Sequence, residues 1–387
     1  MTALRFANGT VLSADGPLDG AVITVNGDRI TAIAPLDSAA GEVVDLHGGW
    51  LVPGFIDTQV NGGGGVLLNE QPTVDGIAAI GAAHVQYGTA AFLPTLISDT
   101  PDVIARTLDA MDAAITAGVP GVVGAHIEGP CISELRKGIH DPGKFRRLDD
   151  AMIDLLSRPR KGRVMVTLAP ELTDRASISR LAAAGVIVSA GHTDADYETM
   201  VAAIAAGTTG ITHLFNAMSP LLHRAPGVVG AALDDRDVYC GLIPDGLHVH
   251  DAALRLAINA RPHDRLMLVS DAMPSVGAVH KDFWLQGRLI RVQDGKCFGE
   301  DGTLAGSDLD MAGAVRNMVA RTGVTVAKAS SMASANPAAF LGLSGERGTL
   351  APGLRADWVR LTHDLWPSGT WIGGRQVSDG PSSREGL

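Results

Sequence analysis

Eight short apolar runs recur along the middle of the sequence, and Ala-rich amphipathic stretches separate most of them. A buried parallel strand reads as a continuous apolar run, and alternation of such runs with helices indicates a parallel sheet. The runs are WLVPGFIDTQV, TAAFLPTLIS, GVVGAHIEGP, RVMVTLAPE, GVIVSAGHT, GITHLFNAM, VYCGLIPDG and RLMLVSDAM. Eight strand–helix units are the content of a (β/α)8 TIM barrel, so we predict an α/β fold built on that barrel.

Short alternating runs lie on either side of this region. Residues 1–50 contain AVITVNGDRITAIAP and GEVVDLHGGW, which read as strands joined by Asn-Gly and Gly-Gly turns. Residues 343–387 return to short strands. We expect both chain ends to form one small β-sandwich-like domain around a barrel of residues 51–342. The alternating segment 280–303 predicts a hairpin insertion beside the mouth of the barrel.

Composition narrows the function classes. The formal net charge is −11, and an acidic surface disfavours nucleic acid and anionic membranes as partners. No apolar run approaches the length of a membrane span, and the N-terminal residues do not resemble a secretory signal. The 3 cysteines lie far apart, which is typical of reduced thiols, so we expect a cytoplasmic protein.

Polar residues end several of the apolar runs. They are Gln59, Asn61, His126, Glu128, His192, His213, Asn216, Asp245, His248 and Asp271. The active site of such a barrel lies where its strands end. One glutamate and two histidines from three different strands suit a catalytic zinc with a position left for water, and an aspartate on a fourth strand suits a general base and acid. A single histidine at a strand end is more often a core residue, so only the whole set indicates a barrel hydrolase that uses a metal.

The motifs HIEGP, KGIH, SAGHT, THLFNAM, APGVVGAAL, DGLHV, SDAM and LAGS follow one another in this order. Together they resemble the N-acetylglucosamine-6-phosphate deacetylase family of the amidohydrolase superfamily, over nearly the whole chain. The resemblance implies a distorted barrel, a small β domain built from both termini, and a homodimer. It also implies that the acetamide of N-acetyl-D-glucosamine 6-phosphate is hydrolysed to D-glucosamine 6-phosphate and acetate.

The resemblance assigns roles to individual residues. Glu128, His192 and His213 match the metal ligands, and Asp271 matches the catalytic acid and base. Arg224 matches a phosphate-binding arginine that can reach the site of the neighbouring subunit. The other positions that match substrate contacts are Ile139, His140, Asn216, Ala217, His248, Leu304, Ala305 and Gly306.

The first run ends differently from that of many superfamily relatives, which carry His-x-His there and bind a second metal. Gln59 and Asn61 occupy these positions, and amides are weaker zinc ligands than imidazole. We therefore expect one divalent ion per subunit, zinc first, with iron, cobalt and manganese as alternatives, and a supporting role for His126. The glycines at 62–65 would let backbone approach closely; a phosphate-cradling loop is the alternative.

Other functions stay open from sequence. One is a related amidohydrolase, such as a deacetylase for N-acetylgalactosamine 6-phosphate or a cyclic-amide hydrolase. The other is a non-enzymatic sugar-phosphate-binding protein, which the presence of Asp271 beside three metal-ligand candidates disfavours, because binding alone needs no proton shuttle.

Overall fold

The computed structural model describes residues 2–36 and 41–381. A ring of eight parallel strands forms its centre, and neighbouring strands in the ring follow one another in sequence. They are β6 (Phe55–Val60), β9 (Thr89–Ile97), β10 (Gly124–Glu128), β11 (Arg163–Leu168), β12 (Ile187–Ala190), β13 (Thr208–Ile211), β14 (Tyr239–Leu242) and β15 (Leu266–Leu268). Seven of the eight predicted runs contain one of these strands in full, and the sixth, which begins at Gly210, overlaps the last two residues of β13. The predicted barrel is confirmed.

The ring closes just beyond the last strand. The Asp271 N–H donates to Gln59 O at 3.0 Å, and Val60 bridges Ala272 in parallel. Every residue of β6 and of β9 is buried, as expected for strands covered on both faces. Phe340 and Leu341 pack with Ile56 and other buried residues of the barrel strands.

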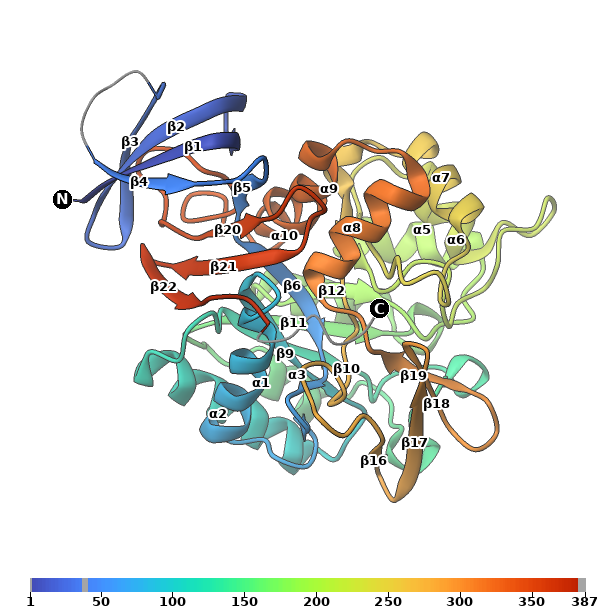
Figure 1. The fold of residues 1–387 in the computed structure, drawn as a ribbon. Coiled ribbons are helices and arrows are strands. Elements are labelled where there is room, and N and C mark those ends of the chain that lie inside the picture. Colours follow the sequence, from blue (N-terminus) through green and yellow to red (C-terminus); the bar gives the residue numbers. More distant parts are fainter. Residues whose placement is uncertain (1, 37–40, 382–387) are drawn as a thin grey trace.

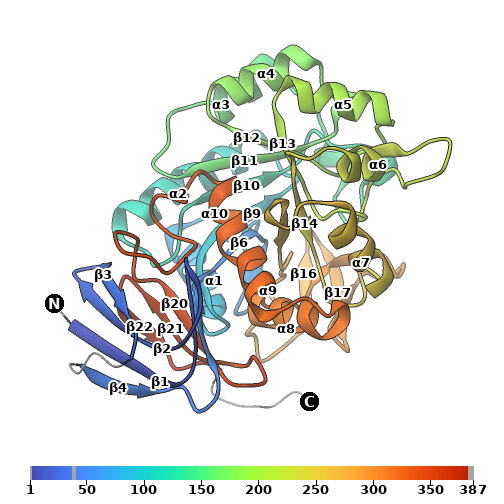
Figure 2. The same ribbon diagram turned by 90° about the horizontal axis from the view of Figure 1, so that it is seen from above.

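Helices surround the strands (Figure 1; Figure 2). They are α1 (Val74–Val85), α2 (Pro101–Ala117), α3 (Asp150–Leu156), α4 (Arg175–Ala183), α5 (Tyr197–Ala206), α6 (Gly227–Asp234), α7 (Asp251–Ala260), α8 (Met311–Thr322), α9 (Val326–Ala333) and α10 (Ala335–Phe340). Several begin at a side-chain cap: Asp174, Asp196 and Asp310 each accept a backbone N–H from the first turn. Within the described ranges, no helix combines the length and apolar character needed to cross a membrane.

Both chain ends join in a second, mostly antiparallel sheet of eight strands. They are β1 (Thr2–Ser13), β2 (Gly16–Asn26), β3 (Arg29–Ala34), β4 (Glu42–Asp45), β5 (Trp50–Pro53), β20 (Trp358–Leu361), β21 (Pro367–Ile372) and β22 (Arg375–Ser378). Phe6, Ile23, Leu51, Trp358 and Trp371 from both chain ends share one core. The predicted union of the termini is therefore confirmed.

The first apolar run is divided between the two sheets. Its residues 50–53 form β5, which pairs antiparallel with β20, and residues 55–60 form the first barrel strand. Gly54 lies between the two strands. A Cβ added to it would lie 2.4 Å from the Ala90 Cβ, so only a glycine lets the chain pass this closely between the barrel and the small sheet.

Two small antiparallel sheets lie beyond the carboxyl ends of the barrel strands. The predicted insertion is a four-stranded antiparallel sheet, labelled at the lower right of Figure 1. Its strands are β16 (Phe283–Leu285), β17 (Arg288–Gln293), β18 (Lys296–Phe298) and β19 (Leu304–Ser307). The glycine run forms a small hairpin from β7 (Gly62–Gly63) and β8 (Val66–Leu67).

Candidate active site

The carboxyl ends of the barrel strands open into a pocket of about 380 Å³. Most of the residues expected at the site line it: Asn61, Glu128, Ile139, His140, His192, His213, Asn216, Ala217, His248, Asp271, Leu304 and Gly306. They come from separate strands and loops, and barrel closure brings them together.

Three donor atoms in this pocket lie close together. Glu128 Oε1 is 3.1 Å from His213 Nε2 and 3.3 Å from His192 Nε2, and the two imidazole nitrogens are 3.1 Å apart. Ligand atoms bound tetrahedrally to zinc at about 2.0–2.1 Å are roughly 3.3 Å from one another. The spacing and the donor types therefore fit three ligands of one small divalent ion.

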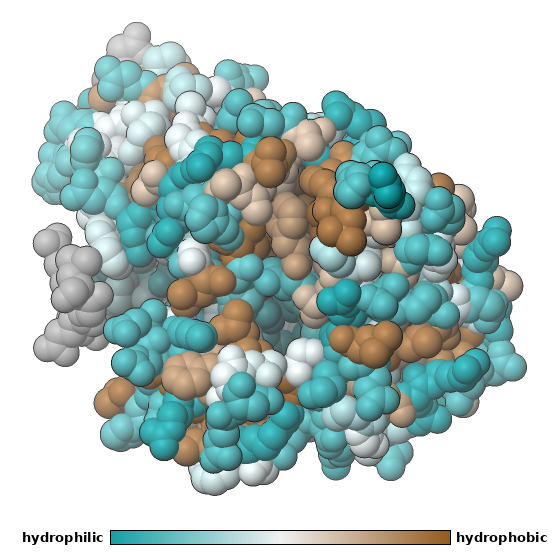
Figure 3. Space-filling view, turned by 90° about the vertical axis from the view of Figure 1, so that its right-hand side faces the viewer, coloured by the Kyte–Doolittle hydropathy of each residue, from teal (hydrophilic) through white to brown (hydrophobic). Residues whose placement is uncertain are grey.

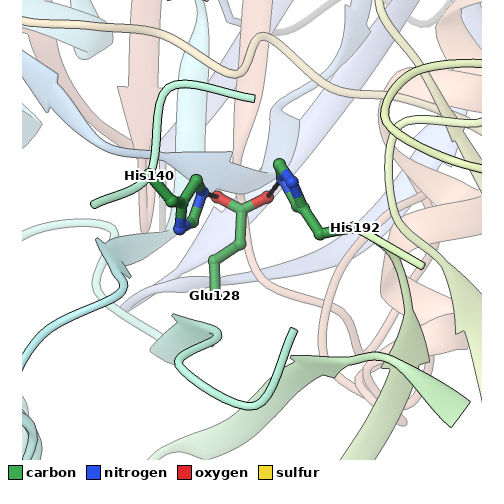
Figure 4. Close-up of side chains that lie close together, drawn as sticks. All are labelled: Glu128, His140 and His192. Carbon is green, nitrogen blue, oxygen red and sulfur yellow. Dashed lines mark ion pairs between the residues drawn. The ribbon is translucent and has the colours of Figure 1, made fainter. Parts of the chain in front are cut away.

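A fourth group lies beside this triangle. His140 Nε2 is 3.9 Å from Glu128 Oε2, and its ring centroid lies 4.4 Å from that of His192. Figure 4 shows the Glu128 carboxylate between the two imidazoles. Glu128, His140 and His192 also form a buried group with ligand atoms within 4.8 Å of one another. His213 lies nearer than His140 to the carboxylate, which favours His213 as the third ligand.

Electrostatic interactions between the carboxylate and the imidazoles shift the pKa values of Glu128 and His213 in opposite directions. Burial alone would raise the pKa of Glu128, but hydrogen bonds and charge from His192 and His213 lower it well below its usual value. Burial alone would lower the pKa of His213, but Glu128 and then Asp271 outweigh it, so the pKa of His213 is raised. The His192 Nδ1–H donates to Arg136 O at 2.8 Å, which leaves its Nε2 lone pair directed at the site.

Asp271 follows the last barrel strand and lies in the same pocket. Its Oδ1 accepts hydrogen bonds from Asn61 Nδ2 at 2.8 Å and from Gln59 Nε2 at 3.0 Å. Burial, with the nearby Glu128 charge, raises the pKa of Asp271 to about 6. A carboxyl group that titrates near neutral pH can both accept and return a proton.

Gln59 joins the two carboxylates of the site. Its Nε2 also donates to Glu128 Oε1 at 3.0 Å, so one neutral amide bridges Glu128 and Asp271. Asn61 Oδ1 has no hydrogen-bond partner in the described part of the chain and is buried. The end of the first strand thus supplies polar amide contacts, and it offers one free acceptor to a ligand or water.

Two other histidines differ in their setting. His248 Nδ1 lies 2.6 Å from Asp245 Oδ2, which orients the ring at the pocket wall. His126 does not line the pocket: its Nε2 lies 2.7 Å from Thr167 Oγ1, its Nδ1 lies 3.4 Å from Thr95 Oγ1, and burial lowers its pKa to about 4. Both of its nitrogens have partners that do not line the pocket, which suits a supporting role.

Two of the expected substrate contacts lie outside the pocket wall. Ala305 is fully buried between Leu304 and Gly306, which do line the pocket. Arg224 is exposed at the tip of the loop before α6, where Leu222 and Ala225 bond to each other. Figures 1 and 2 both show this loop standing out from the body, and Arg224 does not line the pocket of its own chain.

Some residues at the site escaped the sequence analysis. Ser98, directly after β9, contacts His140 Nδ1 through both Oγ and N–H. Arg136 lines the pocket, pairs with Asp194 at 2.8 Å and orients His192 through its carbonyl. Ser98 is the last polar residue of the second run, so the rule that found the other strand-end residues would also have found it. The Arg136 carbonyl contact has no signal in the sequence.

A carboxylate and imidazoles with metal-ligand spacing, brought with an aspartate to one mouth of a parallel barrel, are typical of a metal-dependent hydrolase. The chain belongs to the amidohydrolase family: the model of the family described as "Amidohydrolase family" matches residues 50–377.

Relatives cover nearly the whole molecule. N-acetylgalactosamine-6-phosphate deacetylase of Shewanella sp. is 42% identical over 88% of this chain and 86% of its own length. Human N-acetylglucosamine-6-phosphate deacetylase is 38% identical over 99% and 97%. The crystal structure of N-acetylglucosamine-6-phosphate deacetylase from Pasteurella multocida superposes with a TM-score of 0.93 at 34% identity, over 97% of this chain and 99% of the other.

Proposed function

We propose that this enzyme hydrolyses the acetamide of N-acetyl-D-glucosamine 6-phosphate to D-glucosamine 6-phosphate and acetate, a step of amino-sugar catabolism. The observation that carries the proposal is the 3.1–3.3 Å triangle of Glu128, His192 and His213 donor atoms in one pocket with Asp271. A sugar-phosphate-binding protein would need neither a metal triangle nor a proton acceptor beside it.

Glu128, His192 and His213 would hold one divalent ion, with zinc as the first choice and iron, cobalt or manganese as alternatives. A metal at these donors supplies Lewis acidity, which makes water nucleophilic near neutral pH and polarises an amide carbonyl. Asp271 takes the proton of the attacking water and returns it to the sugar nitrogen as the C–N bond breaks. Its pKa of about 6 suits both transfers.

His140 and the loop ends orient the substrate. The His140 imidazole faces the pocket and can stabilise the oxyanion that develops on the acetyl oxygen. Asn216 and Ala217 border the same space, and Ala217 has a positive φ of 49°. His248, held by Asp245, contacts the sugar, while residues 304–306 pack over it from the insertion.

Arg224 would bind the phosphate of the neighbouring subunit's substrate in a homodimer. Its exposed loop carries Leu221 and Leu222, which are 53% and 55% exposed. Hydrophobic side chains form several groups on the face toward which this loop points (Figure 3). Exposed apolar residues around an arginine are typical of the centre of a protein interface. A cytoplasmic location belongs to the same proposal and agrees with three free, buried cysteines in the described chain.

N-acetyl-D-galactosamine 6-phosphate is the second candidate substrate. The 42% identity to the Shewanella deacetylase for that epimer exceeds the 38% identity to the human deacetylase for the gluco epimer. The two sugars differ only at C4, so the choice between them depends on contacts remote from the metal and Asp271.

The test is acetate release from both phosphorylated epimers and from unphosphorylated N-acetylglucosamine, with metal-loaded and chelator-treated enzyme. We expect kcat/KM to be highest for the gluco phosphate and activity to be lost on chelation. A higher value for the galacto phosphate would select the second candidate. Equal turnover with and without metal would overturn the proposed chemistry.

A further inference from the structure

Ser98 makes two contacts to one atom of His140. Its backbone N–H donates to His140 Nδ1 at 3.3 Å, and its Oγ lies 2.7 Å from the same nitrogen. Both residues are almost fully buried. A backbone N–H can only donate, so His140 Nδ1 must carry a lone pair, and the Ser98 hydroxyl donates to it as well. A neutral imidazole with a free Nδ1 carries its proton on Nε2.

This tautomer separates the roles of the two neighbouring rings. His192 donates its Nδ1–H to Arg136 O, so its Nε2 is free to bind a metal. His140 has the opposite arrangement: its Nε2–H faces Glu128 and the pocket, and a protonated nitrogen cannot be a metal ligand. His140 is therefore equipped to donate a hydrogen bond to an oxygen in the pocket.

Ser98 is itself held from the insertion. Gln286 Nε2 donates to Ser98 O at 3.0 Å. Gln286 lies in the two-residue turn between β16 and β17 with φ at 48°, a conformation that is uncommon for a residue other than Gly, Asn or Asp. On the other side, a Cβ added to Gly129 would lie 2.3 Å from Ser98 Oγ. The hydroxyl thus has little freedom to leave His140.

We propose that Ser98 is a positioning residue, which holds His140 in the Nε2–H tautomer so that it donates a hydrogen bond to the substrate carbonyl and is excluded from the metal. This inference rests on the proposed deacetylation, and it adds to it the residue that selects the protonation site of His140.

The kinetic test uses Ser98→Ala in the metal-loaded enzyme. Loss of a hydrogen-bond partner behind an active-site group typically costs about 10- to 100-fold, and we expect that loss in kcat with little change in KM or bound metal. Ser98→Thr, which keeps a hydroxyl, should restore most of the activity. The matched control is Ser330→Ala, which removes a buried hydroxyl in α9 that has no hydrogen-bond partner in the described chain and should leave kcat unchanged.

A double-mutant cycle distinguishes positioning from general destabilisation. If Ser98 acts only through His140, Ser98→Ala should add nothing to the loss caused by His140→Ala. An equal loss in both backgrounds, or unchanged kcat in the single variant, would overturn the inference.

A spectroscopic test does not depend on the substrate. In protein with 15N-labelled histidine, the His140 Nδ1 signal, assigned by its absence from His140→Ala, should be that of an unprotonated nitrogen, and Ser98→Ala should move it toward the protonated type. A protonated Nδ1 in the unaltered enzyme would contradict the proposed tautomer. Absence of deacetylase activity alongside an unprotonated Nδ1 would instead count against the proposed substrate only.

Discussion

At the scale of single residues, Gln59 shows how a neutral amide can connect two buried carboxylates. Glu128 and Asp271 are both buried, and burial together with the charge of Glu128 raises the pKa of Asp271. Gln59 Nε2 lies 3.0 Å from an oxygen of each. Its two N–H groups thus offset part of the repulsion between the carboxylates without adding a charge.

Replacement of Asp271 by Asn tests the proton transfer. The amide keeps an oxygen that can accept from Gln59 and Asn61, but it cannot take a proton. We expect kcat to fall about 10²- to 10⁴-fold, with bound metal and substrate Kd nearly unchanged. Steady-state kinetics, metal analysis and calorimetric titration measure these three quantities, and near-normal turnover would remove Asp271 from the mechanism.

A second carboxyl group affects stability. Burial raises the pKa of Asp57 to about 7, against hydrogen bonds from Ser270 and Gln59. Between the unfolded value of 3.8 and about 7, the folded state binds more protons at this site than the unfolded state. The contribution of Asp57 is therefore most favourable below pH 4 and is lost as the pH rises through 7, at up to roughly 1.4 kcal/mol per pH unit.

Asp57→Asn should remove this part of the pH dependence. An amide can donate to Ser270 Oγ, whose hydrogen can turn to Gln59 O, 3.2 Å away. We expect a higher free energy of unfolding at pH 8 and a flatter profile between pH 5 and 8, measured by urea denaturation. Asp75→Asn on the exposed first turn of α1 is the control, and the idea fails if both variants follow the original profile.

At the scale of elements, the strand ends depend on backbone that turns sharply. His192, His213 and Asp271 have φ values of 49°, 34° and 53°, which L-residues rarely adopt. Such conformations persist where surrounding contacts enforce them and are frequent at active sites. Here they turn the chain directly after β12, β13 and β15, so that each side chain points into the mouth of the barrel.

The glycines at 62–65 allow two backbone segments to pack closely. Gly64 and Gly65 form the two-residue turn between β7 and β8 with φ of 61° and 84°, as type I′ turns require. Gly62 donates to Ala272 O, next to Asp271. The hairpin thus joins the end of the first barrel strand to the segment after the last. The N–H groups of Gly64 and Gly65 also donate to carbonyls of this segment, Val276 O and Pro274 O, which disfavours the alternative of a phosphate-cradling loop.

Gly62→Ala should disturb this junction. The new Cβ would lie 2.5 Å from Val66 O and 2.8 Å from Pro274 N, and the backbone must shift. Overpacking of this kind typically costs about 1–3 kcal/mol, read from the urea midpoint. Gly345→Ala, where no atom lies within 4 Å of the new Cβ, should change the free energy of unfolding by less than about 0.5 kcal/mol. Equal stability of the two variants would contradict the packing role.

At the scale of the whole molecule, the barrel should hold one metal ion per chain. The neutral amides of Gln59 and Asn61 cannot offset the repulsion between two divalent ions about 3.5–4 Å apart. Metal analysis of protein purified without chelator, followed by anomalous scattering, counts the ions. Two fully occupied sites would refute the single-metal expectation. With one ion found, Gln59→His together with Asn61→His should favour a second.

A substitution of Arg224 tests the proposed phosphate contact in the homodimer. Arg224→Ala should lower kcat/KM roughly 10- to 100-fold for the phosphorylated substrate, as expected for a lost charge-assisted hydrogen bond, and much less for N-acetylglucosamine. Arg106→Ala, an exposed arginine on α2, is the control. Equal effects on both substrates would make Arg224 structural.

Mixing two impaired chains tests whether Arg224 crosses between subunits. In a dimer of one Arg224→Ala chain and one Asp271→Asn chain, one of the two sites would contain both intact residues. Restored turnover after subunit exchange supports the shared site, whereas none would show that each chain completes its own.

The sequence by itself determined the barrel, the union of the two chain ends and the residue types at the strand ends. These depend on local patterns: apolar runs, helical spacing and polar residues where a run stops. The tertiary structure alone decided which atoms meet. Gln59 and Asp271 are 212 positions apart, Ser98 and His140 are 42 apart, and the first run divides between two sheets. Hydrogen-bond partners and histidine tautomers depend on distances of a few tenths of an ångström between such segments, and only the closed barrel sets those distances.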